Sequence, residues 1–270
     1  MAQMEPQTSF PFPCSSNIRM NIDQPKTVIV TGAGSGIGFA CMQALLAGGH
    51  QLCAADLNPI PMESITPENL PRLLTVHADV ADGESCRNVA TQTMEKFGAL
   101  TSLIHMAAAH STKTWQELNS EHFNRIMAPN VTGAFLIAQA IAEHMGQQGG
   151  GAIVLTSSGS INVGGVGGHG RGGPAYVASK AAIIGLTRAL ARSLAPLKIR
   201  VNAVSPGSTD TAMTASYDDE ARRKVGERTL VARIGRPEEI AAVALFLISD
   251  AASYMTGEIV NVNGGGSFGN

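Results

Sequence analysis

The sequence contains little charge, few aromatic rings and few cysteines. Charged residues make up 15 % of its 270 residues and aromatic residues 4 %, and the formal net charge is -2. Such a chain has no excess of cations to bind nucleic acid or an anionic membrane surface, so we expect neither as a partner. Its four cysteines form no Cys-x-x-Cys pair. This favours free thiols in a reducing, cytoplasmic compartment over a disulfide framework.

Long hydrophobic runs are also missing. No apolar stretch reaches the roughly 18–20 residues that a membrane-spanning helix needs, and the first residues lack the basic start and apolar run of a signal peptide. Residues Met1–Gln24 are polar and contain three prolines. We therefore expect a flexible N-terminal extension at 1–24 and one folded domain at 25–270.

Short apolar runs alternate with amphipathic stretches from Lys26 onward. Glycine is frequent, with 30 residues, and 44 % of the chain is hydrophobic, which suits parallel strands covered on both faces. The alternation predicts an α/β fold: a single Rossmann-like, doubly wound domain with a seven-stranded parallel sheet flanked by helices on both faces. The predicted strands are Thr27–Thr31, Gln51–Ala55, Leu73–His77, Leu103–Met106, Ala152–Thr156, Arg200–Val204 and Ile259–Val262. The predicted helices are Gly36–Ala47, Gly83–Phe97, Glu121–Met145, Ala175–Leu194, Asp218–Thr229 and Pro237–Ser249.

A glycine-rich turn joins the first predicted strand to the first predicted helix. It reads Thr31-Gly32-Ala33-Gly34-Ser35-Gly36-Ile37-Gly38, which differs from the general dinucleotide pattern Gly-x-Gly-x-x-Gly. Glycines at such a turn let the backbone approach a pyrophosphate, and the helix N-terminus then offers unpaired N–H groups to it. A tight turn without a ligand is the alternative for the glycines alone.

Asp56 follows the second predicted strand directly, 24 positions after Gly32. A carboxylate there can accept both hydroxyls of an adenosine ribose, and it would repel the 2′-phosphate of NADP. The glycine turn contains no Arg or Lys to offset that repulsion. Together the two features predict NAD in preference to NADP, whereas Asp56 alone would be a capping or turn residue. Asp79 and Val80, after the third strand, are expected to reach the adenine.

A second set of residues indicates the chemistry. Tyr176 and Lys180 are one helical turn apart, so both side chains can point into one site. Ser158 follows the strand predicted at Ala152–Thr156, Asn130 begins Asn-Val-Thr-Gly, and Pro206-Gly207 follows the sixth strand. Tyr-x-x-x-Lys alone occurs in many ordinary helices.

All these motifs occur here in one order, and together they closely resemble the short-chain dehydrogenase/reductase family over residues 26–267. The resemblance implies four catalytic residues, Asn130, Ser158, Tyr176 and Lys180. The cofactor-binding residues that we predict from the glycine turn, the strand ends and this resemblance are Gly32, Ser35, Gly36, Ile37, Gly38, Asp56, Leu57, Asp79, Val80, Ala107, Tyr176, Lys180, Pro206, Gly207, Thr209 and Thr211.

The tyrosine would be the general acid and base. A free phenol has a pKa near 10, and an ammonium about 4 Å away interacts by about 4 kcal/mol in a partly screened site. We therefore expect Lys180 to lower the pKa of Tyr176 by up to about three units. Ser158 would stabilise the substrate oxygen, Lys180 would also hold the nicotinamide ribose, and Asn130 would hold a water that relays protons from Lys180.

The expected substrate site lies in two segments, 159–175 and 208–231. Residues Gly164–Gly173 include seven glycines, and we expect them to form a lid that orders on ligand binding. The segment 208–231 has few large apolar groups, which favours a polar or hydroxylated substrate. His105 is expected to be a satisfied core histidine, and no His, Cys and carboxylate cluster predicts a metal. The substrate-binding candidates are His110, Ser160, Asn162, His169, Arg171 and Met213.

The sequence therefore predicts an NAD-dependent oxidoreductase that interconverts a secondary alcohol and a ketone. Two alternatives remain. The first is a nucleotide-sugar epimerase or dehydratase, although such chains usually differ in glycine spacing. The second is a dinucleotide-sensing regulator without activity, which would be free to lose its tyrosine or lysine. Small residues on the helix after Tyr176 suit either core packing or helix contacts between subunits, and in the family they suit a homotetramer. They are Ala178, Ala181, Ala182, Gly185 and Ala189.

Overall fold

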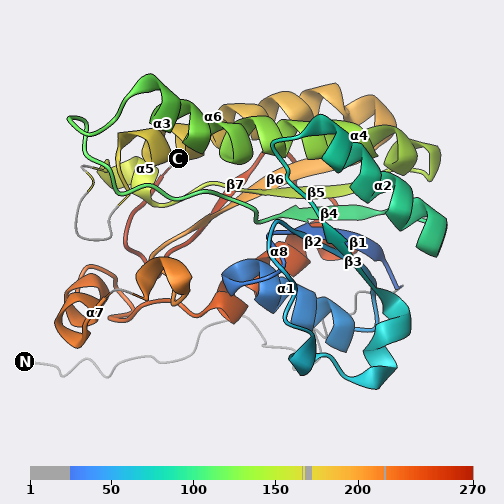
Figure 1. The fold of residues 1–270 in the computed structure, drawn as a ribbon, viewed down its shortest axis with the longest axis horizontal. Helices are drawn as coiled ribbons and strands as arrows, with labels where there is room; N and C mark the ends of the chain where they lie inside the picture. Colours follow the sequence, from blue (N-terminus) through green and yellow to red (C-terminus); the bar gives the residue numbers. More distant parts are fainter. Residues whose placement is uncertain (1–24, 166, 168–171, 216, 270) are drawn as a thin grey trace, which may run out of the picture.

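The protein forms one parallel sheet between two layers of helices. Its structure is a computed structural model that describes residues 25–165, 167, 172–215 and 217–269, so the extension predicted at 1–24 lies outside the described residues. Seven strands pair in the order β3-β2-β1-β4-β5-β6-β7, all parallel (Figure 1). The predicted fold class is confirmed. The strands are β1 Thr27–Thr31, β2 Gln51–Asp56, β3 Leu73–His77, β4 Ser102–His105, β5 Gly151–Thr156, β6 Ile199–Pro206 and β7 Ile259–Val262.

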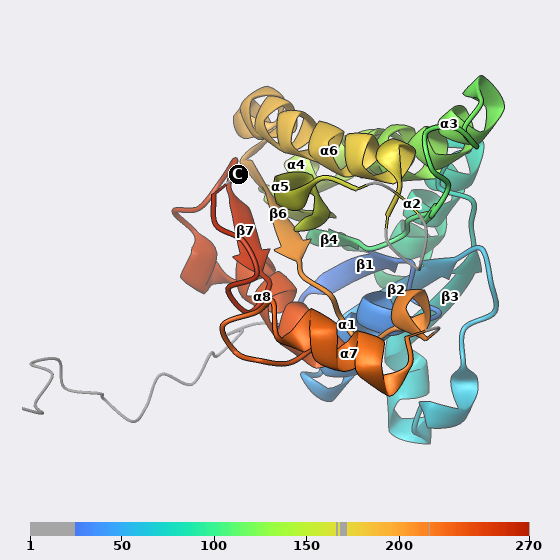
Figure 2. The same cartoon turned by 90° about the vertical axis from the view of Figure 1, so that its left-hand side faces the viewer.

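Helices cover both faces of the sheet. Figures 1 and 2 show α2, α4 and α6 on one face and α1 and α8 on the other. The helices are α1 Gly36–Ala47, α2 Gly83–Phe97, α3 Ser120–Met127, α4 Gly133–Gln147, α5 Ser160–Val163, α6 Pro174–Ser193, α7 Asp219–Gly226 and α8 Pro237–Ile248. The predicted helices agree with these to within a few residues. The exceptions are the α3–α4 region, which is divided, and α7, which ends at Gly226 rather than Thr229.

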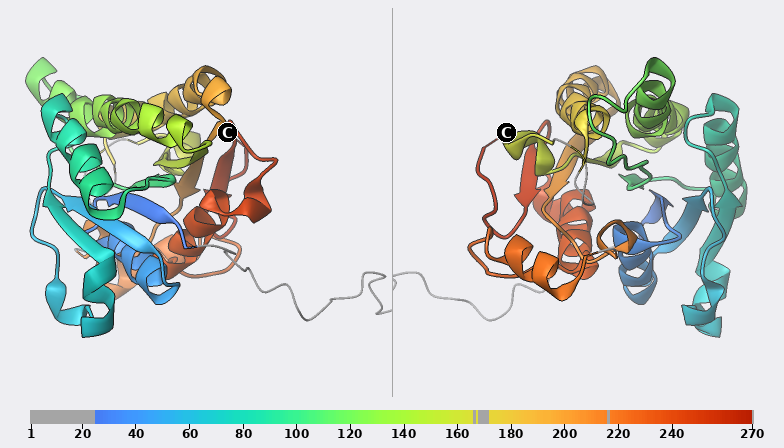
Figure 3. Two further views of the ribbon diagram at one scale, coloured as in Figure 1. Left: turned by 90° about the vertical axis from the view of Figure 1, so that its right-hand side faces the viewer. Right: turned by 60° about the vertical axis from the view of Figure 1, so that its left-hand side comes forward.

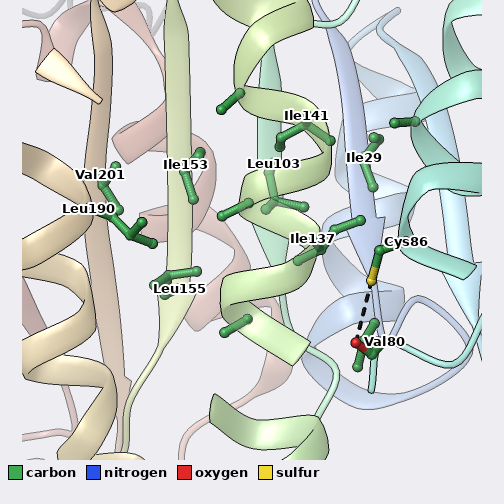
Figure 4. Packing of buried hydrophobic residues seen from close by; sticks show 14 of the residues in the cluster. Ile29, Val80, Cys86, Leu103, Ile137, Ile141, Ile153, Leu155, Leu190 and Val201 are labelled. Carbon is green, nitrogen blue, oxygen red and sulfur yellow. Dashed lines mark hydrogen bonds between the residues drawn. The ribbon is translucent and has the colours of Figure 1, made fainter. Parts of the chain in front are cut away.

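The core lies on both sides of the sheet because successive strand residues point to opposite faces. In β1, Ile29 packs under α2 and α4, while its neighbours Val28 and Val30 pack under α1 and α8. All five residues of β1 are buried, as the continuous apolar run requires. Figure 4 shows the first of these clusters, in which Cys86 Sγ donates a 3.4 Å hydrogen bond to the carbonyl oxygen of Val80.

The long helix after β4 changes its winding beside Asn130. Residues Ala128–Thr132 form a π-helix between α3 and α4. Pro129 has no N–H for an α-helical hydrogen bond, so the ladder must rearrange around it. The π-helical turn at this proline therefore divides the stretch into α3 and α4.

The whole stretch Ser120–Gln147 is 28 residues long and apolar enough, by length and composition, to cross a membrane. Within the domain it packs as a core helix, because Ile137, Ile141 and Met145 are buried in the cluster under α2 and α4. The prediction that no apolar stretch is long enough for a membrane-spanning helix was therefore wrong. Length and composition do not distinguish such a core helix from a membrane span.

The strand order places the functional residues at one end of the sheet. The chain turns back between β1 and β4, so the connections after these neighbouring strands diverge to opposite faces and leave a crevice at their carboxyl ends. Helices α5 and α7 and the chain that follows β7 lie at this end, on the left of Figure 1 (Figures 1 and 3).

Candidate active site

A cleft of about 930 Å³ opens at the carboxyl ends of the strands. Every residue predicted to bind the cofactor lines it, from Gly32 in the turn after β1 to Thr211 in the loop after β6. Ser158, Tyr176 and Lys180 line the same cleft, whereas Asn130 is buried behind it. The fold thus brings together segments that lie more than 140 positions apart in the sequence.

The glycine turn has the shape that a close ligand approach requires. Gly32 has φ +69°, and a Cβ built there would lie 2.6 Å from the backbone nitrogen of Ala107. A Cβ on Gly38 would lie 2.0 Å from the carbonyl oxygen of Gly32. Only glycine fits at either position. The turn therefore stays small enough for the N-terminus of α1, which begins at Gly36, to face the cleft and receive an anionic group.

Asp56 lies beside the glycine turn. Its Oδ2 accepts a 2.8 Å hydrogen bond from the backbone N–H of Gly34, and its Oδ1 accepts one of 2.8 Å from that of Asn58. These bonds fix the carboxylate at the cleft, where Leu57 is exposed next to it. The placement fits a group that accepts ribose hydroxyls.

The loop after β3 forms the next part of the wall. Asp79 Oδ1 accepts a 2.8 Å hydrogen bond from the N–H of Ala81, which shapes the turn. Val80 is buried against Gly133 of α4, where a Cβ would lie 2.8 Å from Val80 Cγ2. Asp79 and Val80 line the cleft, as their predicted role at the adenine requires.

Loops after β6 close the cleft on the other side. The carbonyl oxygen of Pro206 accepts a 2.9 Å hydrogen bond from the N–H of Gly159, next to Ser158. Gly207 lies so close to β7 that a Cβ would meet Asn263 Cα at 2.8 Å. Thr209 is buried, and its carbonyl oxygen accepts a bond from Thr214 Oγ1 of 3.0 Å. This part of the cleft wall is built from backbone held by short hydroxyl side chains, and the half-buried Thr211 lines the cleft beside Gly36.

Lys180 is buried at the base of the cleft. Its Nζ donates a 2.9 Å hydrogen bond to the carbonyl oxygen of Thr156 and lies 5.8 Å from the ring centroid of Tyr176. Only 2 % of the residue is exposed. Burial disfavours the charged form and lowers the pKa of Lys180 to about 8.

Tyr176 corrects one expectation. We expected Lys180 to lower the pKa of the phenol, but burial raises the pKa of Tyr176 above its ordinary value. A hydrogen bond with Ser158 lowers it by less than burial raises it. The physical reason is that the lysine ammonium is directed at Thr156, and that loss of the phenolic proton would create a buried anion.

Asn130 forms a link between two parts of the site. Its Oδ1 accepts a 2.7 Å bond from the N–H of Ala109, and its Nδ2 donates to the carbonyl oxygen of Ala109 and to Ser179 Oγ, both at 2.9 Å. Both amide hydrogens are thereby engaged. Asn130 fastens the loop after β4 to α6, and a relay water could be held by its side chain only through the second lone pair of Oδ1.

The histidine at the end of β4 is buried, as expected, but only half satisfied. His105 Nδ1 lies 2.8 Å from Thr31 Oγ1, while Nε2 has no hydrogen-bond partner in the part of the chain that the structure describes. Burial, with a contribution from Lys180, lowers the pKa of His105 to about 3. The ring is therefore neutral, and it is not an acid–base group of the cleft.

The substrate candidates divide into three groups. His110, Ser160 and Met213 line the cleft, and the rings of His110 and Tyr176 pack edge to face with centroids 4.7 Å apart. Asn162 does not line it, which corrects the prediction: its Nδ2 donates to Ser267 Oγ at 3.3 Å and to the carbonyl oxygen of Gly269 at 2.9 Å. Its position on α5 turns the amide toward the C-terminal segment instead.

The other two substrate candidates, His169 and Arg171, lie outside the described residues, and so does the centre of the predicted lid. The described residues 25–269, apart from these gaps, contain no group of three or more His, Cys, Asp or Glu able to hold a metal ion.

Sequence reasoning missed two parts of the wall. The chain after β7 contributes Asn263, Gly266 and Ser267, and the π-helix region contributes Arg125 and Pro129. The run Gly264–Gly266 was the available signal for the first, since a glycine cluster after the last strand marks a turn at the carboxyl edge of the sheet. The signal for the second was Asn130, which is buried behind the wall on the same helical stretch as Arg125 and Pro129.

Comparison with known proteins gives a consistent picture. Residues 32–267 match the family model described as enoyl-(acyl carrier protein) reductase. The chain is 34 % identical to a 3-oxoacyl-[acyl-carrier-protein] reductase of Thermotoga maritima, over 89 % of this chain and 97 % of that protein. It is 37 % identical to a 3alpha-hydroxysteroid dehydrogenase of Mediterraneibacter gnavus, over 88 % of this chain and 96 % of that protein.

Solved structures show the same architecture. A short-chain type dehydrogenase/reductase from Mycobacterium marinum superposes with a TM-score of 0.83 at 32 % identity, covering 93 % of this chain and 99 % of that one. An aldohexose dehydrogenase from Thermoplasma acidophilum superposes with a TM-score of 0.80 at 27 % identity, covering 90 % and 94 %.

Proposed function

Because the chain belongs to the short-chain dehydrogenase/reductase family and is an oxidoreductase of that family, we propose that it interconverts a secondary alcohol and a ketone with NAD(H). The observation that carries the proposal is the meeting of Ser158, Tyr176 and Lys180 in the same cleft as the glycine turn. The nicotinamide cofactor would supply the hydride chemistry when bound.

The chain's own residues would handle the proton. In alcohol oxidation Tyr176 removes the hydroxyl proton, and in ketone reduction its phenol returns one. Ser158, hydrogen-bonded to that phenol, stabilises the negative charge that develops on the substrate oxygen. Lys180 contributes the cation at the base of the cleft, and Asn130 holds the loop after β4 against α6 so that this geometry is kept.

The dinucleotide fits the residues that are present. The turn at Gly32 and Gly38 leaves space that a Cβ would fill, and the N-terminus of α1 faces it. We propose NAD in preference to NADP, because both oxygens of Asp56 are held at the cleft and would repel a 2′-phosphate. In the described part of the cleft wall the Arg and Lys residues are Arg125, Lys180 and Arg228, and none belongs to the glycine turn.

For the substrate we propose a polar or hydroxylated small molecule. Thr229, Ser267 and Arg228 of the cleft wall support this class. Val163 and Met213 also line the wall and are 72 % and 43 % exposed, which favours an alcohol with an apolar body as the second candidate. A panel of sugar alcohols, hydroxysteroids and 3-hydroxyacyl thioesters, assayed by reduction of NAD, distinguishes the two.

The deciding experiment is Tyr176→Phe, which keeps the ring and removes the acidic proton. Turnover should fall by about 10²–10⁴-fold while NADH binding stays near that of the wild type. Tyr254→Phe, at an exposed tyrosine, is the control and should retain turnover. Most activity remaining in Tyr176→Phe would exclude this tyrosine as the acid and base. Tight NAD binding without turnover on any substrate class would favour the dinucleotide-sensing regulator, and isomerisation of a nucleotide sugar would favour the epimerase.

We also propose a homotetramer. The small residues of α6 that could form a helix contact between subunits are largely exposed in the single chain: Ala178, Ala181, Gly185 and Ala189 are exposed and Ala182 is half-buried. No heavy atom of the described residues lies within 4 Å of a Cβ built on Gly185. Light scattering after size-exclusion chromatography tests the assembly. A monomer at micromolar concentration would contradict it.

A further inference from the structure

Two loops meet on the ring of Tyr176. The ring of His110, in the loop after β4, packs against it edge to face, with centroids 4.7 Å apart and an interplanar angle of 78°. Gly172, at the end of the glycine-rich segment, comes so close that a Cβ there would lie 2.7 Å from Tyr176 Cδ1. On another side Tyr176 forms a small hydrophobic cluster with Ile126 and Ala175.

The same two loops are fastened to each other by their backbones. The N–H of Gly173 donates a 2.8 Å hydrogen bond to the carbonyl oxygen of Ser111. A Cβ on Gly173 would lie 2.0 Å from the carbonyl oxygen of Lys113, and one on Gly167 would lie 2.6 Å from that of Thr112. Side chains at these glycines would therefore push the loops apart. Glycine at 167, 172 and 173 therefore allows the two loops to pack closely.

From these contacts we infer that His110 and Gly172 are positioning residues, which hold the ring of Tyr176 between the two fastened loops and so aim its hydroxyl at the substrate. The inference rests on the proposed function, in which Tyr176 transfers the proton. A donor must lie within about 2.6–3.2 Å of the atom that it protonates, and a misplacement of about 1 Å can cost about 10²-fold in rate. Ring orientation in this site is thus a determinant of turnover.

His110 is suited to this role by its charge as well as its shape. Burial, together with the nearby Lys180, lowers the pKa of His110 below its ordinary value. At neutral pH the imidazole is uncharged, and it presents a neutral aromatic surface to Tyr176. Aromatic pairs in this arrangement attract each other by more than the area that they bury accounts for.

The first test is Gly172→Ala, with Gly83→Ala as the matched control. Gly83, the first residue of α2, has ordinary van der Waals neighbours at 3.5 Å and beyond and does not line the cleft. We expect Gly172→Ala to lower kcat by about 10–100-fold while the dissociation constant of NADH changes less than threefold, and Gly83→Ala to change neither. Wild-type kcat in Gly172→Ala would overturn the inference, as would a loss confined to NADH binding.

The second test separates packing from imidazole chemistry. His110→Ala should lower kcat by about tenfold, and His110→Phe, which keeps an aromatic ring in the same place, should recover most of that loss. Equal loss in both variants would overturn the positioning role. Because the chain has only three tyrosines, Tyr176, Tyr217 and Tyr254, NMR of protein labelled at the tyrosine Cζ reports the ring directly. The Tyr176 signal should move in Gly172→Ala and the Tyr254 signal should not.

The tests also separate this inference from the proposed function. If wild-type protein oxidises none of the alcohols in the panel, the function fails whatever the variants do. If wild-type protein is active and Tyr176→Phe is not, but Gly172→Ala and His110→Ala turn over normally with an unmoved Tyr176 signal, only the positioning inference fails.

Discussion

The ammonium of Lys180 is hydrogen-bonded to the carbonyl oxygen of Thr156, 2.9 Å away, rather than to the phenol of Tyr176. Thr156 is the last residue of β5, and its own hydroxyl donates a 2.7 Å bond to the carbonyl oxygen of His105 at the end of β4. The cation is therefore anchored to the carboxyl edge of the sheet, in a place where only 2 % of the residue is exposed. We expect the buried charge of Lys180 to be needed for activity and to lower the stability of the folded protein.

Replacing the lysine should stabilise the protein and abolish turnover. Burial lowers the pKa of Lys180 from 10.5 to about 8, so holding its charge at pH 7 opposes folding. We expect Lys180→Met to raise the free energy of unfolding at pH 7 by about 1–2 kcal/mol, after loss of the bond to Thr156 is subtracted. Urea denaturation at pH 7 measures this. The control is Lys224→Met, at an exposed lysine paired with Glu220, which should change the free energy by less than about 0.5 kcal/mol.

The sign of the pH dependence follows from the same shift. Between pH 8 and pH 10.5 the unfolded chain keeps a proton on Lys180 that the folded chain has lost, so this group makes stability rise with pH across that window. The advantage of Lys180→Met should accordingly be constant below pH 8 and shrink toward pH 10.5. An advantage that grows with pH would contradict the assignment.

The pH profile of activity should follow Tyr176. Burial raises the pKa of its phenol, so at neutral pH the group is protonated in the free enzyme. We expect kcat/KM for ketone reduction to stay nearly constant from neutral pH to pH 10, because the phenol remains protonated, and kcat/KM for alcohol oxidation to rise over the same interval as the phenolate fraction grows. Initial rates in both directions between pH 6 and 10 give the test. Profiles that rise together would identify a different titrating group.

Removing the carboxylate at the end of β2 should change cofactor choice. Asp56→Ala removes the acceptor for the ribose hydroxyls, so NAD should bind more weakly. It also removes the repulsion of a 2′-phosphate, so the ratio of kcat/KM for NAD to that for NADP should fall by at least about tenfold. Asp219→Ala, in the first turn of α7 and outside the cleft wall, should leave the ratio as it is. Equal use of NAD and NADP by the wild type would refute the role given to Asp56.

Two glycines with similar φ values allow the destabilisation caused by backbone strain to be measured apart from that caused by a steric clash. Gly32 and Gly98 have φ values of +69° and +68°. A Cβ built on Gly32 would lie 2.6 Å from the backbone nitrogen of Ala107, whereas one built on Gly98 would have no heavy atom of the described residues within 4 Å. Gly98→Ala should destabilise the protein by about 1–2 kcal/mol, which is the cost of the left-handed backbone conformation alone.

Gly32→Ala should destabilise the protein by more than Gly98→Ala and should also lose NADH binding, because the clash moves the turn against the loop after β4. Thermal denaturation and NADH titration of both variants measure the two effects. If both variants were destabilised equally and Gly32→Ala still bound NADH, the glycine turn would be able to accommodate a Cβ without disrupting the cofactor site.

Much of the architecture could be predicted from local patterns. The apolar run at Val28–Val30 and the small-residue turn after it predict a buried parallel strand and a phosphate-binding helix start, because both depend on residue types at fixed spacing. Tyr176 and Lys180 are placed on one face by helix periodicity alone. The structure confirms the sheet and puts these residues in one cleft.

Other features depend on contacts between distant segments, which no local pattern encodes. The direction of the Lys180 ammonium is set by Thr156, and the amide of Asn162 is turned away from the cleft by Gly269, 107 positions later. Glycine at 172 looks the same in sequence as glycine at 164, yet a Cβ would collide with Tyr176 at the first and meet no described atom within 4 Å at the second. Composition does not separate a glycine required by packing from one required by a turn.

The sequence by itself determined the fold class and the family and pointed to the side chains that we propose to react, because these follow from periodicity and from short motifs. The tertiary structure alone decided the protonation tendencies of those side chains. Burial raises the pKa of Tyr176 and lowers that of Lys180, and the depth of burial exists only once helices and loops from the whole chain have packed around the cleft.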